Sequence, residues 1–135
     1  MISIYKNFSN KLGDENILNI FQLIKSGRFK NEIKAIRDAK KEKKLSEADK
    51  LKSNLLAFTP SGTFGDKRKK EFLKSYSKII NLDFDHIPQN KIKDLVTIIN
   101  ECKFTYGSFI SPSGEGIKVF IKINLTGNKS EVPGN

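Results

Sequence analysis

The spacing of hydrophobic residues changes from a helical to an alternating period along the chain. Before residue 55, apolar residues recur every three or four positions, which is typical of helices packed on one side. This spacing predicts a helix over residues 15–25, with Asp14 as its cap and Gly27 as its stop. The apolar stripe of that helix consists of Ile17, Leu18, Phe21 and Ile24.

Two more helices and a short strand are predicted in the same part of the chain. Residues 30–44 carry a thin apolar stripe and a very basic end. Ser46 followed by Asp49 resembles a capping box, which predicts a third helix ending near Asn54. Residues 2–8 alternate loosely between apolar and polar side chains and predict a strand.

After Leu55 the pattern changes to short apolar runs separated by turn residues. An apolar run at 55–59 is followed by a segment rich in turn-forming residues, Pro60–Gly65, which predicts a loop. The alternating segment KIINLDFD at 78–85 predicts the clearest strand of the chain. The remaining pattern predicts a helix beginning near Pro88 and two strands at 104–111 and 117–123.

This order of elements predicts a mixed α/β (α+β) fold with helices on one face of a sheet. No internal repeat and no Gly/Ser-rich linker interrupts the sequence, so residues 1–135 are expected to form a single domain. Within it, residues 1–55 are mostly helical and residues 56–125 supply the sheet. The tail carries no closing element in its pattern, and we therefore expect a domain that is truncated at its C-terminal side.

Composition narrows the class of protein. The 135 residues are 37% hydrophobic, which suffices for one core. No apolar stretch approaches the roughly 20 residues that span a bilayer, and the N-terminus has no signal-peptide core. We therefore expect a cytoplasmic protein without a membrane partner. Cys102 is the one cysteine, which excludes an intrachain disulfide and predicts a thiol buried in the core.

Charge points to polyanionic partners. The formal net charge is +10, and a basic surface attracts nucleic acid and nucleotides through counterion release. The predicted contact with single-stranded DNA or RNA is the basic segment Lys67, Arg68, Lys69 and Lys70. A second basic group is interpreted more simply as the solvated end of a helix: Lys40, Lys41, Lys43 and Lys44.

Two carboxylates share one face of the strand at 78–85. Side chains two apart on a strand point to the same side, so Asp83 and Asp85 lie opposite the apolar residues Ile80, Leu82 and Phe84. Two like charges this close repel each other unless a cation lies between them. Mg²⁺ and Mn²⁺ prefer such hard oxygen ligands and leave positions open for phosphate. The pair therefore predicts a metal site; the alternative is that both aspartates are turn residues at a strand end.

The last two strands add a candidate phosphate contact. Lys118 alternates with Ile117 and Val119, so it projects from the face opposite to an apolar core. If that is also the face of the aspartates, Lys118 can contact the phosphates of a metal-bound nucleotide. The turn before it brings backbone N–H groups to the same place, and its candidate nucleotide-binding residues are Ser113, Gly114 and Gly116.

Three motifs occur in an order typical of one protein family. The first is Ser61-Gly62-Thr63-Phe64 followed by Arg68, and the second is Leu82-Asp83-Phe84-Asp85-His86-Ile87. The third runs from Phe109 to Val119 and contains the turn Ser113-Gly114-Glu115-Gly116. With these motifs, and with Ile24–Gly27 and Ile36-Arg37 before them, nearly the whole chain resembles the VirE N-terminal domain family of bacterial mobile-element proteins. That family is in turn similar to the archaeo-eukaryotic primase superfamily.

The resemblance implies a primase–polymerase fold, in which an RRM-like catalytic sheet follows a helical or α/β N-terminal module. It implies that Asp83 and Asp85 are the Asp-x-Asp metal ligands of a nucleotidyltransferase that uses a nucleoside triphosphate. The second motif of that superfamily usually carries a histidine where this chain has Lys118. A third acidic ligand is expected on a later strand, but after Lys118 the sequence offers only Glu131, in an unsuitable context.

Other classes of protein fit the sequence less well. A primase-like module that binds nucleic acid or nucleotide without catalysis is the alternative favoured by Lys118 and by the missing third acid. Phosphatases of the haloacid dehalogenase type also carry Asp-x-Asp after a strand, but they need further motifs on a larger parallel sheet. A restriction-type nuclease needs an acid and a lysine two residues apart, whereas Glu115 and Lys118 are three apart.

Overall fold

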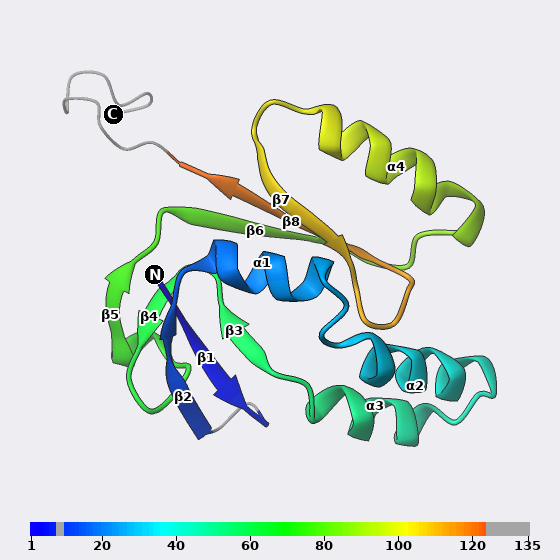
Figure 1. The fold of residues 1–135 in the computed structure, drawn as a ribbon, viewed down its shortest axis with the longest axis horizontal. Helices are drawn as coiled ribbons and strands as arrows, with labels where there is room; N and C mark the ends of the chain where they lie inside the picture. Colours follow the sequence, from blue (N-terminus) through cyan, green and yellow to red (C-terminus); the bar gives the residue numbers. More distant parts are fainter. Residues whose placement is uncertain (8–9, 124–135) are drawn as a thin grey trace.

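The computed structural model describes residues 1–7 and 10–123, and in this part the chain forms four α-helices and three antiparallel sheets (Figure 1). The predicted α+β class is confirmed. The helices are α1 (Ile17–Lys25), α2 (Lys30–Lys41), α3 (Leu45–Ser53) and α4 (Gln89–Glu101). The strands are β1 (Ile2–Lys6), β2 (Asn10–Glu15), β3 (Ala57–Thr59), β4 (Gly62–Phe64), β5 (Leu73–Tyr76), β6 (Ile79–Phe84), β7 (Thr105–Ile110) and β8 (Ile117–Lys122), with a 3-10 turn at Lys70–Phe72.

The first sheet has the order β2-β1-β3, with β1 in the middle. The predicted strand at 2–8 is confirmed over residues 2–6, and residue 8 lies outside the described residues. Strand β2 was not predicted, because its one large apolar side chain, Leu12, is 58% exposed and gives no alternation. Asp14 lies in this strand, where its carboxylate accepts a 2.6 Å hydrogen bond from the buried Ser3.

The helices of the N-terminal part begin at residues other than the predicted caps. Asp14 does not cap α1; the cap is Asn16, whose side-chain oxygen accepts from the Leu18 N–H at 3.0 Å. Helix α1 ends before Gly27, whose φ of +83° suits the predicted stop. The predicted capping box of α3 is also wrong, because that helix begins at Leu45 and Ser46 lies inside it. Helices α2 and α3 form an antiparallel pair (Figure 1).

A further sheet, β4-β5, lies in a region that the sequence assigned to a loop. The turn-forming residues at 60–65 predicted no strand, yet Gly62–Phe64 pair with β5. Glycine is required at position 62 because a Cβ there would overlap the Ser75 carbonyl of the partner strand. The long-range pairing therefore overrides the local turn preference of this segment.

The sheet that carries the candidate residues has the order β6-β8-β7, and all three of its strands were predicted. Helix α4 packs on β7 and β8, as expected. The opposite face is not open, because Phe120 projects from it and is only 1% exposed. The Phe120 ring lies 5.3 Å from that of Phe21 on α1, so the N-terminal part covers this face (Figure 1). The expectation of helices on one face only is corrected accordingly.

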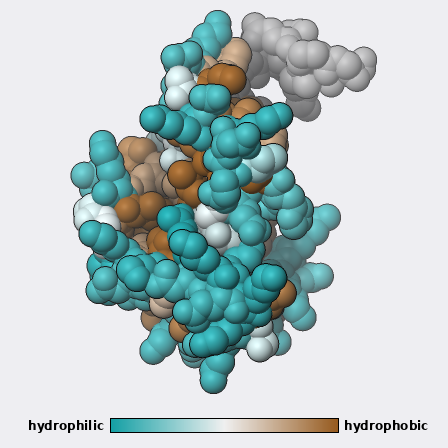
Figure 2. Space-filling view, turned by 90° about the vertical axis from the view of Figure 1, so that its right-hand side faces the viewer, coloured by the Kyte–Doolittle hydropathy of each residue, from teal (hydrophilic) through white to brown (hydrophobic). Residues whose placement is uncertain are grey.

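Cys102 does not lie in the core. Its side chain is exposed, because the residue follows α4 at its C-terminus and no longer belongs to the apolar stripe of that helix. The main core cluster joins α1 to both large sheets and consists of Ile2, Ile17, Ile20, Ile79 and Phe120. Apolar side chains also remain in a recess of the surface that hydrophilic residues surround, as Figure 2 shows. None of the described helices is long and apolar enough to cross a membrane.

Candidate functional site

Asp83 and Lys118 lie directly opposite each other on the paired strands β6 and β8. Side chains of opposite residues share a face, and here the Lys118 ammonium donates to the Asp83 carboxylate over 3.2 Å. The predicted common face of these two residues is confirmed. The pair is partly exposed, at 33% for the lysine side chain and 44% for the aspartate, so a ligand can reach both.

Asp85 follows the end of β6 beside the start of β8. One of its carboxylate oxygens lies 3.1 Å from the place that a Cβ of Gly116 would occupy, and the Phe84 carbonyl oxygen lies 2.6 Å from it. Glycine at 116 therefore leaves room for the Asp85 carboxylate beside the turn that precedes β8.

The turn at residues 111–116 is held by side chains from α2. The guanidinium of Arg37 donates to the carbonyl oxygens of Ser111 and Pro112, each at 3.2 Å. On the other side, the Gln89 side chain donates to the Gly114 carbonyl at 3.0 Å. Contacts across 74 and 75 residues of sequence from α2, and across 25 residues from α4, thus hold this turn.

The backbone N–H groups of this turn donate within the turn. The Gly114 N–H donates to the Ser111 carbonyl at 2.9 Å, and the Gly116 N–H donates to the Ser111 hydroxyl at 3.1 Å. The Ser113 hydroxyl accepts from the Glu115 N–H at 3.4 Å. The sequence suggested these donors for phosphate; in the structure they donate to acceptors within the turn itself.

Lys40 is not part of a simply solvated helix end. Its ammonium lies 2.7 Å from the Glu115 carboxylate and ties α2 to the turn. The hydrogen bond and the positive charge of Lys40 hold the pKa of Glu115 below its usual range, against a smaller opposing effect of burial. Lys41 and Lys43 are exposed, as predicted for the end of the helix.

The lowered pKa of Glu115 gives a pH-dependent stability. The folded state binds this proton less readily than the unfolded state, so the pair stabilises the fold above the unfolded pKa and the effect disappears as pH falls through the folded pKa. Glu115→Gln is expected to flatten the acid side of a plot of melting temperature against pH. The effect is small, at most about 1 kcal/mol for a pair this exposed. Glu101→Gln, an exposed control on α4, should keep the wild-type profile, and two identical profiles would contradict the role of the pair.

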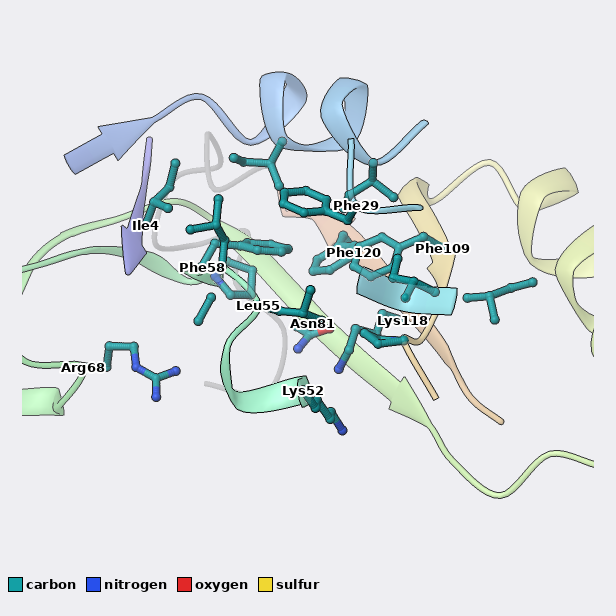
Figure 3. Close-up of a pocket in the computed structure, with 18 residues that line it drawn as sticks. Ile4, Phe29, Lys52, Leu55, Phe58, Arg68, Asn81, Phe109, Lys118 and Phe120 are labelled. Carbon is teal, nitrogen blue, oxygen red and sulfur yellow. The ribbon is translucent and has the colours of Figure 1, made fainter. Parts of the chain in front are cut away.

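A pocket of about 260 Å³ lies between the N-terminal part and the β6-β8-β7 sheet. Its walls are mainly apolar and come from β1, α1, α2, β3, β7 and β8. Lys118 and Asn81 project into it from the face of Asp83, and Figure 3 shows the nitrogen atoms of Lys118, Lys52 and Arg68 along one side of it. The pocket therefore adjoins the Asp83–Lys118 pair.

The basic segment at 67–70 borders the same pocket through Arg68. The Arg68 guanidinium lies 5.8 Å from the centre of the Tyr5 ring, a cation–π distance. Lys67, Lys69 and Lys70 are exposed. Arg68, from the predicted nucleic-acid contact, and Lys118 thus line the same pocket.

The candidate metal ligands among the described residues are two carboxylates. No group of three His, Cys, Asp or Glu side chains in this part of the chain is arranged to hold a metal ion. Asp83 lies in β6 and Asp85 just after it, and Mg²⁺ is commonly held by one or two carboxylates together with substrate phosphates. Glu131, the remaining acid after Lys118, lies outside the described residues.

Comparison with known families gives one match. Residues 50–134 match the BT4734-like N-terminal domain. The chain belongs to this family. The BT4734-like match includes Asp83, Asp85, Lys118 and the basic segment 67–70, and it begins inside α3. No curated protein and no solved structure matches the chain significantly.

Two residues near the candidate site were not identified from the sequence as part of it. Arg37 was named only within the Ile36-Arg37 pair of the family resemblance, and Lys52 occurs in a helix with no local feature that sets it apart from other basic residues. They come close to the sheet only through long-range packing of the N-terminal part. Strand alternation puts Asn81 on the face of Asp83, but its position in a pocket was not predictable.

Proposed function

We propose that the chain is a primase-like nucleotidyltransferase domain of a mobile-element or replication protein. In this proposal it binds the Mg²⁺ or Mn²⁺ complex of a nucleoside triphosphate at Asp83, Asp85 and Lys118. The observation that carries the proposal is the cross-strand pair Asp83–Lys118, with Asp85 just after the end of the Asp83 strand. The pair brings an acidic candidate metal ligand and a cation for phosphate onto one accessible face.

The proposed role of each residue follows from its charge. Asp83 and Asp85 supply hard oxygen ligands, and a bound Mg²⁺ would offset the charge that develops on the phosphates during transfer. Lys118 supplies a further positive charge to the phosphates. Without ligand, the ammonium group of Lys118 offsets the negative charge of the Asp83 carboxylate. When a ligand binds, this group would only have to move from the carboxylate to the phosphate.

The order of motifs supports a primase-like assignment. The Asp-x-Asp strand and the Ser-Gly-Glu-Gly turn resemble the first two motifs of VirE N-terminal domains and of primase–polymerases. Lys118 stands where those proteins usually carry a histidine, and a lysine retains the positive contact with phosphate. An α/β N-terminal module precedes the three-stranded sheet here as well.

The basic segment supplies the second partner of the proposed domain. Lys67, Lys69 and Lys70 form an exposed cationic stretch, and Arg68 joins it to the pocket. Single-stranded DNA or RNA that follows this stretch would reach the face of Asp83. The net charge of +10 favours such a partner.

Binding of nucleotide tests the proposal directly. Wild-type protein is expected to bind ATP or dATP in the presence of Mg²⁺, measured by titration calorimetry. The double variant Asp83→Asn, Asp85→Asn should bind at least about tenfold more weakly, equivalent to about 1.4 kcal/mol. The control Asp94→Asn removes an exposed carboxylate from α4 and should leave binding unchanged. Unaltered affinity in the double variant would place the nucleotide elsewhere.

A second candidate is a primase-like module that binds nucleotide or nucleic acid without transferring nucleotides. It is favoured by the engagement of Asp83 with Lys118 and by the lack of a third acid near this pair among residues 1–7 and 10–123. The two candidates separate in an assay of labelled nucleotide incorporation on single-stranded template. Incorporation that Asp83→Asn removes supports the transferase, whereas tight binding without incorporation supports the module.

A further inference from the structure

The pocket between the N-terminal part and the sheet has two kinds of surface. Its interior is apolar and partly aromatic, with Phe29, Phe58 and Phe109 only partly buried. Cations from three separate segments line it as well: Lys52, Arg68 and Lys118. Asp83 and Asp85 do not line it, so it is a space beside the metal ligands rather than part of them.

We propose that this pocket is a nucleobase subsite, which takes the base of the nucleotide whose phosphates contact Lys118. The inference rests on the proposed function and assigns the base of the nucleotide to the apolar interior and its phosphates to the cations. The N-terminal part would then contribute directly to ligand binding and not only to the fold.

The charge and the shape of the pocket select this occupant. A ligand must present an apolar flat group to the interior and negative charge to the cations, and a nucleotide combines the two. A volume of about 260 Å³ is just below the roughly 300–1,000 Å³ of typical small-molecule sites, so it admits one such group and not a run of stacked bases. Aromatic side chains are the usual stacking partners of nucleobases.

Three phenylalanines of the pocket form one cluster. The rings of Phe109 and Phe120 stack at 5.6 Å with an interplanar angle of 28°, and Phe58 lies 6.0 Å from Phe120. Because both rings contact the buried Phe120, the side chains of Phe58 and Phe109 are held in place and form an aromatic wall of the pocket. A base entering the pocket would meet this wall without displacing a core side chain.

Asn81 gives the apolar pocket a group that can recognise a base edge. Its side chain lies on the face of Asp83 and lines the pocket (Figure 3). A carboxamide offers one acceptor and two donors, which match the hydrogen-bonding edge of a base.

The test compares ligands that share only the base or only the phosphates. ATP, adenosine and inorganic tripolyphosphate are each titrated into wild-type protein with Mg²⁺, by calorimetry and by NMR shifts of the pocket residues. Ile33→Trp fills the pocket from α2 and should weaken ATP binding at least about tenfold. It should remove the adenosine-induced shifts and leave tripolyphosphate binding within about twofold.

A second variant and a control guard against a folding defect. Asn81→Ala lies on an exposed strand position and should weaken ATP about threefold to tenfold without affecting tripolyphosphate. Ile98→Trp changes an exposed residue of α4 and should alter neither ligand. Equal losses for ATP and tripolyphosphate, or no loss for ATP, would overturn the base subsite while the proposed function stands. Wild-type protein that binds none of the three ligands would overturn both.

Discussion

Replacing Asp83 and Asp85 together by asparagine is expected to abolish the Mn²⁺-induced broadening of NMR signals around residue 84. Asp83 lies opposite Lys118 and Asp85 follows the end of the same strand, and asparagine keeps the shape of both side chains while removing the charge that attracts a divalent cation. In wild-type protein without nucleotide we expect weak binding, because phosphate oxygens are needed to complete the metal's ligands. The measurement is a titration of labelled protein with Mn²⁺.

Lys118→Gln is expected to change the same titration in the opposite direction. The ammonium group, 3.2 Å from Asp83, competes with a metal ion for that carboxylate, so its removal should increase the broadening at a given Mn²⁺ concentration. The same variant should weaken the binding of Mg²⁺–ATP, since a phosphate contact is lost. If Lys118 exchanges between Asp83 and the phosphate as proposed, Lys118→Gln should strengthen the binding of metal alone and weaken the binding of metal with nucleotide.

Controls separate a specific site from general attraction of cations. Asp49→Asn with Asp94→Asn removes two exposed carboxylates from α3 and α4 and should leave the broadening at residue 84 unchanged. Equal broadening in the Asp83, Asp85 double variant would mean that Mn²⁺ binds elsewhere. A loss of both metal and nucleotide binding in Lys118→Gln would indicate that the lysine holds the strands and does not compete with metal.

The face shared by Asp83 and Lys118 could be predicted because it depends on short-range rules. Period-two alternation fixes which side chains of β6 and β8 share a side, and the turn between β7 and β8 brings the strands together. The same rules found all three strands of this sheet. They failed for β2, whose single large apolar residue gives no alternation, and for β4, whose three residues are too few to show one.

The pocket, and the contacts of α2 side chains with the turn at 111–116, could not be predicted, because they depend on contacts between distant segments. Lys40 and Glu115 are 75 residues apart, and neither has a local feature that indicates a partner. Phe120 alternates with Ile117 and Val119 along β8, and this pattern alone gives no sign that its face is covered. The N-terminal sheet and α1 cover that face, which turns a predicted surface into the floor of a pocket.

Single-stranded DNA is expected to bind the wild-type protein with a steep dependence on salt and little preference for sequence. Lys67, Lys69 and Lys70 are exposed beside the pocket, and each phosphate contact contributes about 0.7 to the slope of log K against log salt for a single strand. Replacing these three lysines by glutamine should therefore reduce the slope by about 2. Arg68 is left in place, because it also packs on Tyr5 and lines the pocket.

A charge-matched variant decides whether position or net charge causes the change in slope. Lys41→Gln, Lys43→Gln and Lys93→Gln remove the same three charges from exposed positions on and next to α2 and on α4. If the nucleic acid follows the segment at 67–70, this control should change the slope by much less than 2. Equal slopes for the two triple variants, measured by fluorescence anisotropy at several salt concentrations, would show that the strand responds to overall charge alone. The link of this domain to a template strand would then be lost, while nucleotide binding at Asp83 and Lys118 would remain open to its own test.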